Sequence, residues 1–165
     1  MHKEISDLEF AFNLAVLADT ATLNSGGIPV TAADGDAEDA ILKALTATQP
    51  DDGFLGEETS SRPSRNGRRW IVDGIDGTGG FVAGLPTWGT LIALEQEGEI
   101  TLGMISSPAQ DKRWWAQKGC GAFTGTCHSN RNGRQIRVST NTHDCKSRCY
   151  FAPVQRPSRT SPTVY

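Results

Sequence analysis

Two aspartates, Asp73 and Asp76, lie three residues apart where an apolar run, residues 70–72, gives way to glycine. The apolar run predicts a buried strand, so we expect both carboxylates to emerge together at its end. Upstream lies a second acidic pair, Glu57-Glu58. Carboxylate oxygens are the ligands that Mg²⁺ prefers, and the glycine turn after Asp76 offers backbone N–H groups to an anion. The pattern is therefore typical of a Mg²⁺-assisted phosphate-ester hydrolase.

Two helices and a series of short strands must position these residues. Apolar side chains repeat at helical spacing over 5–18 and again over 37–48. Asp34 and Asp36 precede the second segment, where a short acceptor could cap the helix by satisfying its free N–H groups. We expect a hydrophilic loop, a short helix and seven strands, respectively at residues 59–69, at 78–83, and at 54–55, 70–73, 88–95, 100–107, 113–117, 122–123 and 136–138.

The residues around Asp73 resemble a known family. Gly56-Glu57-Glu58 and the run from Trp70 to Pro86, W-I-V-D-x-I-D-G-T-x-x-F-V-x-G-x-P, are similar to the signature of the inositol monophosphatase superfamily. The later runs 88–94 and 113–123 are most similar to its histidinol-phosphate phosphatase branch. The resemblance implies an α/β (α+β) fold, the N-terminal portion of the layered αβαβα sugar-phosphatase sandwich, with two helices over a mostly antiparallel sheet.

The resemblance also implies a magnesium site. Glu57, Asp73 and the backbone carbonyl of Ile75 would bind a first Mg²⁺, and Asp73 would bridge to a second ion that Asp76 also binds. Water activated by these ions would attack the phosphorus of a small-molecule phosphate ester in line.

The same resemblance implies which residues act on water and phosphate. Glu57 and Thr78 belong to the catalytic set together with Asp34, which would orient Thr78 to position and deprotonate the water. The N–H groups of Gly77 and Thr78, at the start of a helix, would hold phosphate oxygens. The implied substrate is histidinol phosphate, in histidine biosynthesis, with an inositol-1-monophosphatase-like activity as the alternative.

Three features depart from the family pattern. Gly74 stands where the family has proline, and Gly79-Gly80 replace a residue followed by asparagine. The chain also has no Trp-Asp pair, whereas the family carries W-D-x-A-[AG] in its C-terminal half, and that aspartate completes the second metal site. We therefore expect a truncated form of the fold, and a catalytically inactive remnant or a non-enzymatic binding module stays open. Such a half-domain would leave apolar sheet surface uncovered and so favour a homodimer or non-specific self-association.

Charge divides the chain into two parts. The net charge of −3 combines −9 over residues 1–130 with +6 over 131–165. We expect a folded domain at 1–139 and an irregular basic tail at 140–165 that is disordered, because Ser, Thr, Arg and Pro dominate there. Its basic residues lack interleaved aromatic side chains, so nucleic acid is not the expected partner.

Four cysteines lie in the last third of the chain, and with two histidines they raise the possibility of zinc: Cys120, Cys127, His128, His143, Cys145 and Cys149. No C-x-x-C pair is present and the spacings are loose, so we expect free thiols in a reducing compartment instead. No apolar run approaches the length of a membrane span, and the first residues do not read as a signal peptide. The expected location is the cytoplasm, without a membrane partner.

Overall fold

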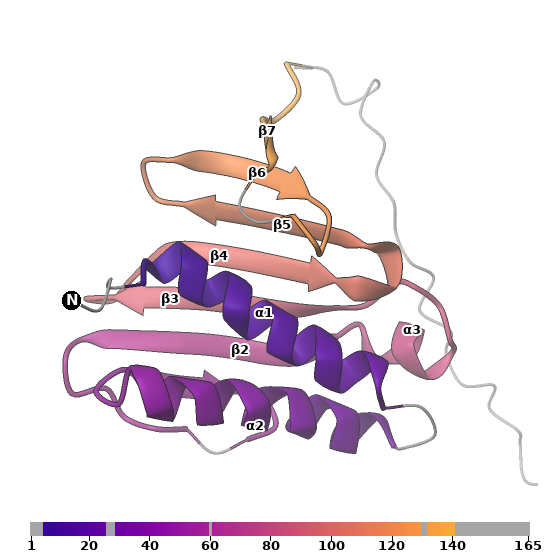
Figure 1. Cartoon of the computed structure of the whole chain (residues 1–165), viewed down its shortest axis with the longest axis horizontal. Coiled ribbons are helices and arrows are strands. Elements are labelled where there is room, and N and C mark those ends of the chain that lie inside the picture. Colours follow the sequence, from indigo (N-terminus) through magenta and orange to yellow (C-terminus); the bar gives the residue numbers. More distant parts are fainter. Residues whose placement is uncertain (1–4, 26–28, 60, 130–131, 141–165) are drawn as a thin grey trace, which may run out of the picture.

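The computed structural model describes residues 5–25, 29–59, 61–129 and 132–140. In this part of the chain, two long helices, α1 (Asp7–Leu23) and α2 (Val30–Thr48), lie on one face of a seven-stranded sheet (Figure 1). The strands follow one another across the sheet in chain order: β1 (Gly53–Gly56), β2 (Arg68–Asp76), β3 (Gly89–Gln96), β4 (Glu99–Ser107), β5 (Lys112–Gln117), β6 (Gly121–Gly125) and β7 (Arg134–Ile136). A short helix, α3 (Thr78–Val82), follows β2, and a 3₁₀ turn, η1 (Pro108–Gln110), follows β4.

The sheet is mostly antiparallel, as predicted. Only β1 and β2 among the described strands run parallel, because helix-free antiparallel hairpins join β3 through β6 in succession. The predicted hairpin between β3 and β4 is confirmed: Glu97 and Gly98 both have positive φ, 51° and 81°. Positive φ at both central residues is what a two-residue hairpin turn requires.

The core lies between the helices and one face of the sheet. Apolar residues of α1 and α2, such as Leu14 and Ile41, meet strand residues whose side chains alternate toward the helices, such as Trp70 and Leu94, and all four are fully buried. The ring of Phe10 in α1 packs edge-on against Trp70, with centroids 5.4 Å apart. The helical periodicity seen in the sequence is therefore the core-facing stripe of each helix.

The opposite face of the sheet carries no helix within the described residues, and we call it the bare face. It agrees with the expectation that apolar sheet surface is left uncovered. Ile105 of β4 is 44% exposed there, and Leu55 of β1 is 37% exposed. No helix in the described part is long and apolar enough to cross a membrane.

Three predicted boundaries are wrong. Helix α2 begins at Val30 rather than near residue 37, because its first two turns are small and polar and do not show the apolar period. The predicted loop 59–69 ends early, since Arg68 and Arg69 pair with β3. The last strand is Arg134–Ile136 rather than 136–138. Most of the predicted tail, residues 141–165, lies outside the described residues.

Candidate functional site

Strand β2 places Asp73 at the end of its regular ladder. Residues of β2 point alternately to the core and to the bare face, so Val72 is buried against the helices while Ile71 and Asp73 face the other way. Pairing with β3 is regular up to Asp73 and resumes only at Asp76 after a register shift. The prediction that an apolar strand delivers Asp73 to its end is confirmed.

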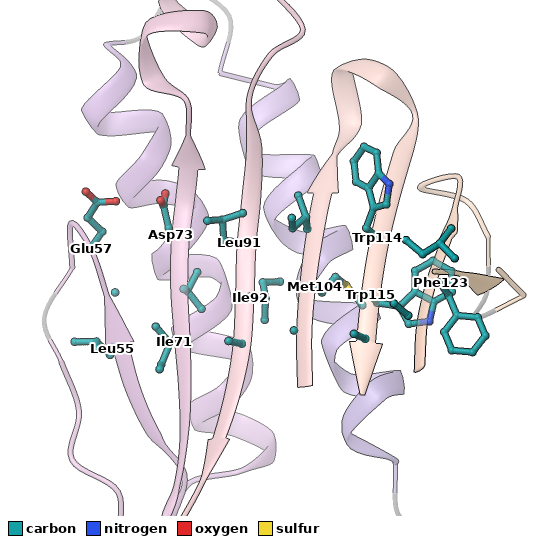
Figure 2. A pocket seen from close by; sticks show the side chains of 18 residues that line it. Leu55, Glu57, Ile71, Asp73, Leu91, Ile92, Met104, Trp114, Trp115 and Phe123 are labelled. Atoms are coloured by element: carbon teal, nitrogen blue, oxygen red, sulfur yellow. The ribbon is translucent and has the colours of Figure 1, made fainter. Parts of the chain in front are cut away.

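The parallel pairing of β1 with β2 brings Glu57 beside Asp73. Gly56 is the register partner of Val72, so the next residue of each strand end, Glu57 and Asp73, meet at one corner of the bare face (Figure 2). Their side chains form a hydrogen bond. Burial, then the charge and hydrogen bond of Glu57, raise the pKa of Asp73 to about 7. We call Glu57 and Asp73 the carboxylate corner.

One oxygen of the corner has no partner. Asp73 Oδ1 is buried and makes no hydrogen bond in the described structure. A buried carboxylate oxygen without a partner is costly, because it has lost water and gained nothing in return. Together with the all-oxygen character of the pair, this orphan oxygen fits a hard divalent cation such as Mg²⁺.

A buried glutamate of α2 holds the turn that carries Glu57, and sequence reasoning missed it. Glu38 is fully buried, and its carboxylate accepts hydrogen bonds from three successive N–H groups, at 2.8 Å from Glu57, 3.2 Å from Glu58 and 2.8 Å from Thr59. It also accepts from the Thr59 hydroxyl at 2.7 Å. A Cβ on Gly56 would lie 2.2 Å from Glu38 Oε2, so only glycine allows this approach. The signal was a glutamate on the apolar stripe of α2.

Asp34 performs a similar task for the end of β2. It lies inside α2, is 3% exposed, and accepts the N–H of Ile75 at 3.0 Å. Burial and then the charge of Glu38 raise the pKa of Asp34 to about 6. Gly74 permits this contact, because a Cβ there would lie 2.5 Å from Asp34 Oδ1. The glycine that replaces the family's proline therefore has a packing reason in this chain.

Two predictions about Asp34 are wrong. Neither it nor Asp36 caps α2, since the helix begins at Val30 after Pro29. Within the described residues Asp34 forms no hydrogen bond with Thr78; its printed partner is the backbone of Ile75 instead. Asp34 thus positions the strand end that carries the carboxylates rather than the threonine.

Gly77 and Thr78 lie at the start of α3, as predicted. Gly77 adopts φ +85°, a left-handed conformation that glycine tolerates best, and a Cβ there would lie 2.6 Å from the Thr87 carbonyl. Its own carbonyl accepts the N–H of Gly80 at 2.8 Å, which closes the first turn. Both Gly77 and Thr78 are exposed. Their assignment to phosphate binding stays a prediction.

Asp76 does not join the carboxylate corner. It is exposed and lines a separate hollow of about 230 Å³ with Thr87 and Trp88, because the register shift after Asp73 turns the chain away. Within the described residues, no three Asp, Glu, His or Cys side chains are grouped so that they could hold one metal ion. The predicted convergence of Glu57, Asp73 and Asp76 is therefore only two-thirds assembled.

The zinc alternative receives no support from the described residues. Cys127 and His128 are described, whereas the other three candidates, His143, Cys145 and Cys149, lie outside. The Cys127 thiol lies 3.8 Å from Ser106 Oγ, next to the buried ion pair in which Arg113 donates to Asp19 at 2.6 Å. Burial raises the pKa of the Cys127 thiol, so it is a poor source of thiolate.

The carboxylate corner borders a large apolar hollow. The hollow, of about 750 Å³, spreads over the bare face, and Figure 2 shows Glu57 and Asp73 at one side of it and Trp114 and Phe123 toward the other. Apart from these two acids its lining is apolar or glycine. The site is thus a pair of carboxylates at the edge of a broad apolar surface.

Comparison with known proteins gives one consistent result. A family model described as the inositol monophosphatase family matches residues 4–163. A histidinol-phosphatase of Chlorobaculum parvum is 41% identical over 157 residues, covering 88% of this chain and 58% of that protein. A histidinol-phosphatase of Mycobacterium tuberculosis is 48% identical over 95 residues, covering 58% and 36%.

A solved structure shows the same fold. The extragenic suppressor protein suhB from Bartonella henselae superposes with a TM-score of 0.72 at 34% identity, covering 81% of this chain and 54% of that one. The predicted fold class is confirmed by this match. The chain spans about half the length of the relatives that it matches.

Proposed function

Because this chain belongs to the inositol monophosphatase family, we propose that its carboxylate corner serves the Mg²⁺-dependent hydrolysis of a phosphate monoester. Histidinol phosphate is the proposed substrate, since the relatives from C. parvum and M. tuberculosis are histidinol-phosphatases. The family resemblance keeps inositol-1-phosphate as the substrate for comparison.

One observation carries the proposal: Asp73 presents a buried, unpartnered oxygen beside the carboxylate of Glu57. Two adjacent carboxylates repel each other, and the raised pKa of Asp73 expresses that repulsion together with burial. A divalent cation would relieve both costs at once, because it supplies opposite charge and a partner for the free oxygen. A stability role alone gives no reason to keep this oxygen unpaired.

The surrounding residues hold the corner in place. Glu38 fixes the Glu57 turn through three N–H groups, and Asp34 fixes the end of β2 through Ile75. In the proposal, Glu57, Asp73 and the Ile75 carbonyl hold Mg²⁺. A bound Mg²⁺ supplies the positive charge that stabilises phosphoryl oxygens and makes water more acidic.

The segment after β2 completes the proposed site. The exposed Thr78 would position the attacking water and accept its hydrogen bond, and the N–H groups of Gly77 and Thr78 would donate to phosphate oxygens. Asp76, in the adjoining smaller hollow, would bind a second cation. This arrangement separates the roles: carboxylates for cations, and the start of α3 for the phosphate.

Phosphate release from histidinol phosphate, with and without Mg²⁺, tests the proposal. We expect release only with Mg²⁺, a loss of release in Asp73→Asn, and slower release from inositol-1-phosphate. Asp39→Asn removes the same charge from an exposed position of α2 and serves as the matched control. Equal release by the wild type and Asp73→Asn would refute the assignment.

The unassembled Asp76 supports a second candidate, a protein that binds Mg²⁺ without turnover. Titration calorimetry separates the two. Mg²⁺ binding that Asp73→Asn abolishes, without phosphate release above the Asp73→Asn background, would establish the second candidate. The absence of both binding and release would reject both.

A further inference from the structure

The side chains of the bare face are arranged in two rows that cross all the described strands. Register partners in a sheet project to the same face, so each row can be followed from strand to strand. The first row runs from Asp73 through Leu91, Ile105, Trp114 and Thr124 to Arg134. The second runs from Leu55 through Ile71, Ala93, Gly103, Ala116 and Ala122 to Ile136.

The first row is acidic at one end and basic at the other. Glu57 and Asp73 form its β1–β2 end, and Arg134 on β7 forms the opposite end. Among the described residues Arg134 takes part in no ion pair, and it is exposed. Between the two ends the row is apolar except for Thr124. The face is therefore polarised across the strands.

The second row is low in its middle. Ala93, Gly103, Ala116 and Ala122 leave little side-chain height there, and a Cβ on Gly103 would meet nothing within 4 Å. Large side chains stand at its two ends. Next to this row the ion pair between Arg69 and Glu95, at 2.9 Å, gives the apolar area a polar rim.

We propose that two copies of this chain pack bare face against bare face, about a two-fold axis that runs along β4, the central strand. Rotation about an axis parallel to the strands lays β1 of one copy over β7 of the other and β2 over β6. Each row then faces itself in reverse order, which is the self-complementary arrangement of an isologous interface.

This axis matches charge with opposite charge and large side chains with small ones. Glu57 and Asp73 of one copy lie over the end of the row that carries Arg134 in the second copy. Ile71 lies over the second copy's Ala122, and Ile105 meets its own equivalent on the axis. An axis perpendicular to the strands would instead place the acidic strand ends over each other, and like charges would repel.

The size of the face predicts a weak, reversible dimer. With strands about 4.8 Å apart, the seven strands span roughly 30 Å, and two rows cover about 13 Å along the strands. The flat area is thus about 400 Å² per copy, or about 800 Å² in total, which is at the low end for specific interfaces. Apolar patches of this size on a protein surface commonly mark interaction sites. We expect a dissociation constant in the micromolar range.

Sedimentation velocity of the full chain over a micromolar to hundred-micromolar range tests the proposal. We expect a monomer–dimer equilibrium that Ile105→Glu shifts fully to monomer. Val16→Glu is the matched control, because Val16 is 51% exposed on α1, on the other side of the sheet. Circular dichroism shows whether each variant is folded.

Charge reversal tests the direction of the axis without touching the apolar centre. Arg134→Glu alone and Glu57→Lys alone should each raise the dissociation constant about tenfold, because each turns attraction into repulsion in both halves of the dimer. The double variant should restore it, whereas Lys43→Glu on α2 should change nothing. A monomer at every concentration, a dimer insensitive to Ile105→Glu, or a double variant weaker than both singles would each overturn the proposal.

Discussion

Glu38→Gln gives the sharpest test of how α2 builds the site. The fully buried Glu38 carboxylate accepts from the N–H groups of Glu57, Glu58 and Thr59 and from the Thr59 hydroxyl. Glutamine has the same shape, but its NH₂ group would point at donors on one side of that turn. The substitution therefore changes hydrogen bonding while leaving the packing volume almost the same.

The expected loss of stability follows from the lost acceptor. Hydrogen bonds to a charged group contribute about 1.5–3 kcal/mol each, and at least one oxygen that accepts two of them disappears. Removing a buried charge and its repulsion of Asp34 offsets part of this loss. We expect a net destabilisation of about 3 kcal/mol, which lowers the melting temperature by about 6–12 °C in a chain of this length.

The same substitution should weaken Mg²⁺ binding. Residues that orient metal ligands typically change affinity by about 10–100-fold when they are replaced. Calorimetric unfolding and Mg²⁺ titration measure the two effects, and Asp39→Asn is the control for loss of one negative charge on α2. An unchanged melting temperature would refute the hydrogen-bond account. A destabilised variant with wild-type Mg²⁺ affinity would refute the role of the Glu57 turn in cation binding.

Three further predictions concern the same region. In the metal-free protein, the free energy of unfolding should fall as pH rises from 5 to 8: the pKa of Asp73 is about 7 when folded and about 3.8 when unfolded, so the folded state holds the extra proton between these values and loses it as pH passes 7. Thermal melts in EDTA should show this slope, and Asp73→Asn should reduce it. Gly56→Ala should destabilise by about 1–3 kcal/mol in urea unfolding, because its Cβ would lie 2.2 Å from Glu38 Oε2. Gly35→Ala, inside α2 with nothing within 4 Å of the new Cβ, should instead stabilise by about 0.5–1 kcal/mol, and a loss of stability there would contradict the helix assignment.

The sequence predicted elements well where side chains show a clear period. The apolar run before Asp73 identified β2, and the Glu97-Gly98 pair identified the β3–β4 turn. The start of α2 was missed because residues 30–36 are small or polar and enter the helix through their packing against α3 and β2. Asp34 therefore looked like a cap although it lies a full turn inside the helix.

The candidate site was predictable only along one strand at a time. Sequence placed Glu57 and Asp73 each at a strand end, and the parallel register of β1 and β2 brought them together. It could not show that the register shift after Asp73 would send Asp76 into a different hollow. Nor could it assign Glu38, since a carboxylate that binds a distant turn differs from a surface carboxylate only in burial.

The carboxylate corner and the bare face are linked because Asp73 belongs to both. Covering the face removes water from the corner, which makes two adjacent carboxylates more costly unless a positive charge accompanies the cover. In the proposed dimer Arg134 of the second copy supplies that charge, whereas in the proposed enzyme Mg²⁺ supplies it. Both charges meet the same two carboxylates, so Mg²⁺ should raise the dimer dissociation constant, and by reciprocity dimerisation should lower Mg²⁺ affinity by the same factor. Sedimentation at matched ionic strength with Mg²⁺ or Na⁺ measures this coupling, and equal dissociation constants in the two salts would show that the dimer leaves the corner open.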